Sequence, residues 1–143
     1  MTARAGEGPP NRERIYHITT AAELRAHCAG DSYAPASLER EGFVHCTATQ
    51  STLLAVARDY YDDATPPLLV LAIDPTRLAA ELRFEAAAPI AGGGTAHLAS
   101  AELFPHLYGP LELAAVVGVG ELRRKGSEFV WPEAFGGLDR WLA

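Results

Sequence analysis

Three of the five histidines share a sequence context that suits a polar site. His17 lies in Tyr-His-Ile-Thr, His45 in Gly-Phe-Val-His-Cys-Thr and His106 in Phe-Pro-His-Leu-Tyr-Gly-Pro. Each has apolar neighbours and is followed within two positions by a Thr or Tyr hydroxyl. A buried imidazole costs free energy unless its nitrogens are paired, and its ordinary pKa of about 6.5 suits acid–base work near neutral pH. We therefore predict that His17, His45 and His106 are the catalytic groups of a small-molecule site.

Two alternative roles for these histidines stay open. Each ring could instead be a core or strand-end residue with both nitrogens paired. Three imidazoles can also hold a zinc ion, but no two histidines here have the His-x-His or His-x-x-x-His spacing that brings two ligands to one ion. We therefore expect no metal, and we expect His27 and His97 at the surface.

The two cysteines, Cys28 and Cys46, have no zinc-type or Cys-x-x-Cys spacing, so we expect two reduced thiols. His45 and Cys46 are adjacent on an expected strand, where neighbouring side chains point to opposite faces, so His45 is badly placed to activate Cys46. Thr47 shares the face of His45 and joins the predicted substrate-binding residues. The sequence contains no phosphate-binding loop, no dinucleotide-binding glycine motif after a strand and no nucleophile-elbow motif.

The expected elements in the first half of the chain are short. Thr20 and Glu23 form a capping box for the first helix, although Thr19 is an alternative N-cap. The apolar residues between Thr49 and Tyr61 recur at helical spacing. Strands are expected at residues 14–18 and 43–47, and helices at residues 21–29, 37–42 and 49–61.

The second half contains the most apolar segment of the chain. Leu68 to Ile73 is a continuous apolar run that predicts a strand buried on both faces. We also expect a half-exposed strand at residues 82–85, a flexible glycine-rich loop at residues 89–95 and a last core strand at residues 114–119. Aromatic and apolar residues after residue 121 are expected to pack back onto the sheet; these are Trp131, Phe135, Trp141 and Leu142.

The whole chain indicates one domain of the α+β class. It has 143 residues, of which 48% are hydrophobic and 21% charged. We expect a disordered tail at residues 1–13, a domain at residues 14–120 and a C-terminal extension at residues 121–143. The net charge of −6 argues against a nucleic-acid surface. No secretory signal and no apolar run of about 20 residues is visible, so we expect a soluble, cytoplasmic protein without a membrane partner. The sequence does not indicate an oligomeric state.

Three motifs in order resemble the bacterial domain-of-unknown-function 952 family. They are Ile-Tyr-His-Ile-Thr at residues 15–19, the stretch from Ser-Leu to Gly-Phe-Val-His-Cys-Thr at residues 37–47, and Phe-Pro-His-Leu-Tyr-Gly-Pro-Leu at residues 104–111. The resemblance covers about residues 15–120. It implies a distant similarity to the ADP-ribosyltransferase fold, a group that includes the RNA 2′-phosphotransferases. The fold implied is a split, mixed or antiparallel sheet with flanking helices.

The resemblance also implies roles for individual residues. His17 and Thr19 would hold a nicotinamide ribose or its equivalent, and Tyr60 or Tyr61 would stack on a planar ring. Tyr108 would supply a hydroxyl to the same pocket. The matching motifs lack the arginines with which the phosphotransferases hold phosphate, and they lack the late glutamate of the protein-modifying transferases.

The function expected from this resemblance is an enzyme acting on an NAD-like or ribose-phosphate small molecule. The reaction would be ADP-ribosyl or phosphoribosyl transfer, or glycosidic cleavage, with NAD as a substrate and no resident cofactor. His45 or His106 would be the general acid or base. Two alternatives stay open, namely a non-catalytic module that binds a small molecule or nucleotide, and a hydrolase or isomerase of a small metabolite in a biosynthetic pathway.

Overall fold

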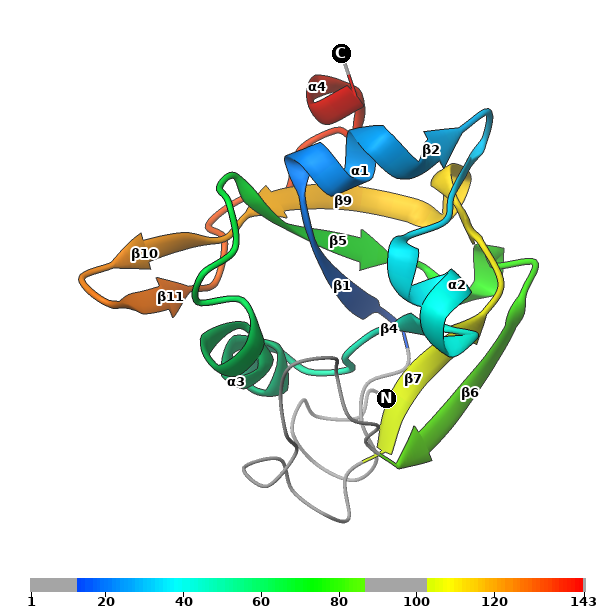
Figure 1. Ribbon diagram of the computed structural model, residues 1–143, viewed down its shortest axis with the longest axis horizontal. Helices are drawn as coiled ribbons and strands as arrows, with labels where there is room; N and C mark the ends of the chain where they lie inside the picture. Colours follow the sequence, from blue (N-terminus) through cyan, green and yellow to red (C-terminus); the bar gives the residue numbers. More distant parts are fainter. Residues whose placement is uncertain (1–12, 87–102, 143) are drawn as a thin grey trace, which may run out of the picture.

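The computed structural model describes residues 13–86 and 103–142. The expected tail up to residue 12, the expected loop at residues 89–95 and His97 lie outside the described residues. Within the described ranges the chain forms one domain of antiparallel sheets and short helices (Figure 1). The predicted α+β class is therefore confirmed.

The main sheet is built around one fully buried strand. Its strands are β1 (Ile15–Thr20), β5 (Leu68–Ile73) and β9 (Val116–Glu121), in the order β1-β5-β9, and both pairings are antiparallel. Every residue of β5 is buried, as the continuous apolar run predicts. The last core strand begins at Val116 and not at Ala114, because Leu113–Ala115 form a short 3₁₀ turn, η2. A second 3₁₀ turn, η1 (Pro75–Arg77), follows β5.

A second sheet has an apolar face and a polar face. Its strands are β4 (Val44–His45), β7 (Leu103–Tyr108) and β6 (Glu81–Ala86), in the order β4-β7-β6, with antiparallel pairings. Leu82, Phe84 and Leu107 pack into the core from one face. Because side chains alternate along a strand, His106 and Tyr108 project from the opposite face. The predicted strand at residues 43–47 shortens to β4.

Three helices surround these sheets, and they are α1 (Ala21–His27), α2 (Ala36–Glu41) and α3 (Gln50–Tyr60). Thr20 is the N-cap of α1, since its Oγ1 accepts a hydrogen bond of 3.0 Å from the Glu23 backbone N–H. The α1 helix ends two residues earlier than predicted, because the next two residues form a strand. A small antiparallel sheet contains β2 (Cys28–Ala29), β3 (Ser32–Tyr33) and β8 (Leu111–Glu112). As predicted, α2 ends at Gly42, whose φ of 89° favours glycine.

The C-terminal segment packs on the main sheet and on α1. It contains the hairpin of β10 (Arg123–Lys125) and β11 (Glu128–Val130) and the helix α4 (Asp139–Leu142). Trp131 contacts Tyr16 edge-on, with ring centroids 5.1 Å apart, and α4 lies beside α1 (Figure 1). Two glycines of β9 permit this packing. A Cβ atom at Gly118 would lie 2.9 Å from the Phe135 Cβ, and one at Gly120 would lie 2.6 Å from the Pro132 Cβ.

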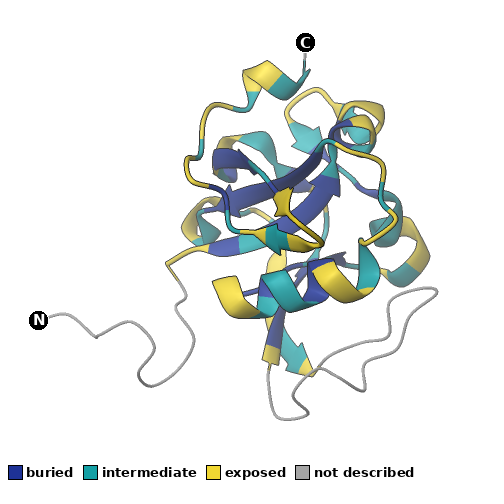
Figure 2. Ribbon diagram, turned by 90° about the vertical axis from the view of Figure 1, so that its left-hand side faces the viewer, coloured by how far each residue is buried: buried dark blue, intermediate teal, exposed yellow. Residues whose placement is uncertain are grey.

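Both edges of the main sheet carry a single β-bridge to a loop. At the β1 edge, Tyr16 and Thr47 exchange two backbone hydrogen bonds of 2.8 Å. At the β9 edge, Val119 and Gly136 exchange two backbone hydrogen bonds of 2.9 Å. The strands of the main sheet are largely buried, while the exposed residues lie mostly on helices, turns and the hairpin (Figure 2). None of the helices in the described part of the chain is long and apolar enough to cross a membrane.

Candidate functional site

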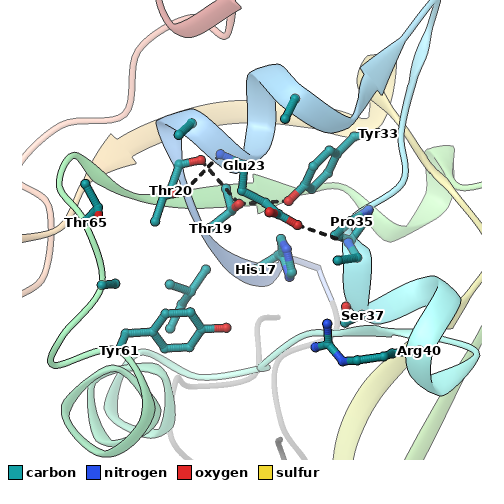
Figure 3. A pocket seen from close by; sticks show the side chains of 15 residues that line it. His17, Thr19, Thr20, Glu23, Tyr33, Pro35, Ser37, Arg40, Tyr61 and Thr65 are labelled. Carbon is teal, nitrogen blue, oxygen red and sulfur yellow. Dashed lines mark hydrogen bonds between the residues drawn. The ribbon is translucent and has the colours of Figure 1, made fainter.

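A pocket of about 560 Å³ opens between β1, the helices α1 and α2, and the residues that follow α3 (Figure 3). Its volume is in the range of small-molecule sites. Its polar lining residues are His17, Thr19, Thr20, Glu23, Tyr33, Ser37, Arg40, Tyr61 and Thr65. The pocket therefore has a strand as its floor and helices on two sides.

His17 is held in one tautomer by the backbone. Its Nδ1 lies 2.6 Å from the carbonyl oxygen of His45, and because a carbonyl only accepts, Nδ1 carries the proton. Nε2 makes no hydrogen bond within the part of the chain that the structure describes. Burial lowers the pKa of His17 to about 4, although the bond to the His45 carbonyl opposes this effect. At neutral pH the ring is therefore an uncharged acceptor in the pocket.

Two tyrosines line the same pocket as neutral hydroxyls. Tyr33 shares a buried hydrogen bond of 2.8 Å with the Thr19 hydroxyl, and burial raises its pKa well above the ordinary value. Tyr61 follows α3, and its hydroxyl points into the pocket (Figure 3). Burial raises the pKa of Tyr61 to about 12. The Tyr61 hydroxyl can therefore donate a hydrogen bond to a ligand at neutral pH, whereas the Tyr33 hydroxyl is already paired with Thr19.

The α2 side of the pocket carries its positive charge. Arg40 and Ser37 lie on this side (Figure 3), and no ion pair joins Arg40 to any acid among the described residues. The carboxylate of Glu23 is already engaged, since its Oε2 accepts a hydrogen bond of 3.0 Å from the Ala36 backbone N–H. The Arg40 guanidinium is exposed and available to an anionic group of a ligand.

A second polar group, the His106 cluster, lies on the polar face of the β4-β7-β6 sheet and consists of Glu41, His45, Glu85, His106 and Tyr108. His106 and His45 are paired in register, with ring centroids 5.8 Å apart. His45 Nε2 lies 2.6 Å from Glu41 Oε1. One oxygen of Glu85 accepts two hydrogen bonds, of 2.8 Å from His106 Nδ1 and of 2.6 Å from the Tyr108 hydroxyl. Both histidines in this cluster therefore have a carboxylate partner.

Aromatic and charged groups surround the His106 cluster. Phe43 stacks on the His106 ring, with centroids 4.1 Å apart and planes at 23°, and the Arg83 guanidinium lies 4.4 Å from the centre of the Tyr108 ring. Burial lowers the pKa of His106, and the bond to Glu85 opposes this effect. The two donated hydrogen bonds lower the pKa of Glu85, so this carboxylate is ionised at neutral pH.

The structure therefore divides the predicted site residues between two places. His17, Thr19 and Tyr61 line the pocket. His45, His106 and Tyr108 belong to the His106 cluster. Thr47 and Tyr60 lie in neither place, because Thr47 is buried beside β1 and Tyr60 packs against a second core cluster under α3. The link between the two places is the hydrogen bond from the His17 ring to the backbone of His45.

Two other chemistries would depend on a cluster of metal-ligating side chains or on a reactive thiol. No group of three or more His, Cys, Asp or Glu side chains within residues 13–86 and 103–142 is arranged to hold a metal ion. Cys46 is buried, and burial raises the pKa of its thiol to about 12, so it stays protonated at neutral pH. It behaves as a packed thiol, as predicted.

Sequence reasoning missed four residues that shape the two places, namely Glu23, Tyr33, Arg40 and Glu85. Glu23 was assigned only to a capping box, but its carboxylate bonds to the start of α2. Arg40 lies on α2 inside the stretch of residues 37–47, and its spacing of three from Ser37 places both on one side of the helix. Glu85 precedes Tyr108 by 23 residues, and no local pattern indicates that the two strands pair.

Comparisons with known proteins agree with this fold. The model of a family described as "Protein of unknown function (DUF952)" matches residues 18–119. A crystal structure of protein CC0527 from Caulobacter crescentus is 26% identical, with a TM-score of 0.62, and the match covers 81% of this chain and 91% of that chain. The solution NMR structure of the same protein gives a TM-score of 0.59, and the match covers 85% of this chain and 92% of that chain. No curated protein matches significantly.

Proposed function

The chain belongs to the DUF952 family of proteins of unknown function, and on the geometry of its pocket we propose that it is an enzyme that binds an NAD-like or ribose-phosphate molecule. The proposed reaction is transfer of the ADP-ribosyl or phosphoribosyl group, or cleavage of the glycosidic bond. The proposal includes an ADP-ribosyltransferase-like arrangement of the two sheets, with the ligand between β1 and α2.

The observation that carries this proposal is the fixed, uncharged His17 ring in the pocket. Its Nδ1 proton is committed to the His45 carbonyl, so Nε2 can only accept. A ribose presents hydroxyl donors, and a buried acceptor that has lost its water selects a ligand that can donate. The Tyr61 hydroxyl lines the same pocket. This set suits a sugar better than a purely apolar ligand.

Arg40 supports a phosphate on the same ligand. Its guanidinium lines the pocket and is not neutralised by a described acidic side chain. Guanidinium groups bind phosphate through paired, charge-assisted hydrogen bonds. Arg40 would therefore take the part that the arginines of the motifs play in the RNA 2′-phosphotransferases, from a different position in the sequence.

Thermal unfolding with three ligands tests the binding step. ADP-ribose and NAD should raise the melting temperature, because a ligand that binds only the folded state adds about 2.7 kcal/mol at a concentration of 100 times Kd. Adenosine, which has no phosphate, should have a smaller effect. Arg40→Ala should weaken ADP-ribose binding about tenfold or more, since a hydrogen bond to a charged group contributes about 1.5–3 kcal/mol.

Arg58→Ala is the matched control for Arg40→Ala. Arg58 is also an exposed helical arginine, but it lies on α3 outside the pocket and pairs with Asp59. Its substitution should leave ADP-ribose binding unchanged. Equal melting temperatures with and without ADP-ribose and NAD would contradict the proposed ligand, and equal losses in the two variants would contradict its position.

A non-catalytic binding module is the second candidate, and the low pKa of His17 favours it. A ring with a pKa of about 4 is a weak base at neutral pH, so His17 alone suits recognition better than proton transfer. Liquid chromatography with mass spectrometry separates the candidates. An enzyme converts NAD to free nicotinamide or a ribosylated product, whereas a binding module returns the ligand intact.

A further inference from the structure

Glu85 bonds to two groups that could each transfer a proton. Its Oε1 accepts hydrogen bonds from His106 Nδ1 at 2.8 Å and from the Tyr108 hydroxyl at 2.6 Å. The three side chains come from two strands, since β6 carries Glu85 and β7 carries the other two. A single carboxylate oxygen therefore fixes the orientation of both an imidazole and a phenol.

The hydrogen bond to Glu85 also determines the tautomer of His106. Because the ionised carboxylate can only accept, Nδ1 of His106 carries the proton, and Nε2 is left with its lone pair. Nε2 makes no hydrogen bond with any residue in the described ranges. The ring is held against rotation by Phe43, which stacks on it. This is the general arrangement by which a carboxylate prepares a histidine to act as a base.

Packing alone does not account for this group. The other face of the same sheet buries apolar side chains such as Leu82 and Leu107 in the core. On the polar face, His106 is only 3% exposed although it has a polar ring. An apolar residue there would avoid the cost of dehydrating an imidazole. The polar group therefore has a use beyond stability.

We propose that Glu85 is a positioning residue that holds His106 as the proton acceptor of the reaction, while the Tyr108 hydroxyl, which donates its hydrogen bond to the same carboxylate, fixes the orientation of Glu85. This inference rests on the proposed function, and it requires that a ligand held in the His17 pocket extend to the His106 cluster, whose residues do not line that pocket. The substrate class is an N-ribosyl cation or a ribose phosphate whose anomeric carbon is attacked by a hydroxyl group.

The proton and electron pairs in this step balance. The hydroxyl oxygen of water or an alcohol forms a bond to the anomeric carbon, and its proton passes to His106 Nε2. The bond from that carbon to the leaving group breaks, and its electron pair goes to the leaving nitrogen or oxygen. The imidazolium then returns its proton to the leaving group or to water, and Glu85 stabilises the imidazolium in the interval.

Glu85→Gln tests the inference, because it removes the charge and keeps the size of the side chain. Turnover of NAD should fall between about tenfold and a hundredfold in kcat, within the range attributed to a positioned acid or base. KM should stay within about twofold, because Glu85 does not line the pocket. Glu85→Asp, which restores the charge, should recover part of kcat.

The pH profile gives an independent readout. The titratable and charged groups that face His106 are Glu85 and Arg83 from β6, His45 from β4, Glu41 from α2 and Tyr108 from its own strand. The charge on Glu85 favours the imidazolium and so raises the pKa of His106. In Glu85→Gln the acidic limb of kcat should therefore move to lower pH. Nitrogen NMR of the wild-type ring should show the proton on Nδ1 at neutral pH.

Glu81→Gln is the matched control. Glu81 lies on the same strand opposite Tyr108 and pairs with Arg83 rather than with His106, so the substitution should leave kcat and its pH profile unchanged. An active wild type with an unaffected Glu85→Gln variant, or a His106 ring protonated on Nε2, would overturn this inference alone. A wild type that neither binds ADP-ribose nor turns over NAD would instead overturn the proposed function on which it rests.

Discussion

The surroundings of His17 and His106 differ although the two residues are buried to almost the same extent, at 5% and 3% exposure. His17 Nδ1 donates a hydrogen bond to a neutral backbone carbonyl, whereas His106 Nδ1 donates one to an ionised carboxylate. Burial lowers the pKa of both rings, and at His106 the hydrogen bond to an ionised carboxylate opposes this effect. Two histidines in similar sequence contexts therefore suit different tasks, recognition in one case and proton transfer in the other.

The largest difference between His17 and His106 should appear in the pH dependence of the free energy of unfolding. The folded-state pKa of His17 is about 4 and the unfolded value is 6.5. Between these values the unfolded chain binds more protons, so the free energy of unfolding should fall as pH drops from 6.5 towards 4. The loss should be about 3 kcal/mol, at about 1.4 kcal/mol per pKa unit.

Urea unfolding at several pH values measures this effect. His17→Gln should remove most of the decrease below pH 6.5. His106→Gln should remove less, because Glu85 opposes the lowering of the His106 pKa. Equal changes in the two variants would show that the two environments do not differ as described.

The second largest difference is expected in the contribution that the hydroxyl groups beside the two histidines make to the free energy of unfolding. Thr19→Val leaves the buried Tyr33 hydroxyl without its partner and should cost about 2 kcal/mol of unfolding free energy. Tyr108→Phe should cost less than about 1 kcal/mol, because Glu85 is 34% exposed and can be hydrated instead. Chemical denaturation measures both. The double variant Thr19→Val/Tyr33→Phe should recover part of the loss, and its failure to do so would assign the cost to packing.

The smallest expected effect is on ligand affinity, and it distinguishes Tyr61 from its neighbour Tyr60. Tyr61→Phe should weaken ADP-ribose binding about fivefold, the equivalent of one neutral hydrogen bond of about 1 kcal/mol, because its hydroxyl points into the pocket. Tyr60→Phe should not change the affinity, because Tyr60 lies outside the pocket. Isothermal calorimetry measures both, and the reverse order would move the ligand to the other side of α3.

Local patterns predicted the elements that depend on local forces. The buried run of β5, the helix α3 within the predicted range of residues 49–61, and the αL glycine that ends α2 follow from side-chain type and spacing. The end of α1 was predicted wrongly, because its last residues are taken by the pairing of β2 with β3. That pairing joins residues across a turn and has no signal in helix propensity.

The candidate site was predicted by residue type but not by arrangement. Three histidines stood out because buried polar rings need partners. Their partners come from other segments, since His17 bonds to the backbone of β4 and His106 bonds to Glu85 on β6. The register of β6 against β7 brings Glu85 within reach, and a single sequence does not contain that register. Arg40 was missed for a similar reason, because the packing of α2 against β4 determines which side of the helix lines the pocket.

The two bridges at the edges of the main sheet affect how separate molecules meet. An edge strand with a row of unpaired backbone groups is a template for the strand of another chain. Here Thr47 pairs with Tyr16 near the start of the β1 edge, and Gly136 pairs with Val119 on the β9 edge. The segment that supplies Gly136 can approach because Gly118 and Gly120 have no side chains. The small size of these two glycines thus lets the chain cover its own β9 edge, which counters edge-to-edge aggregation there.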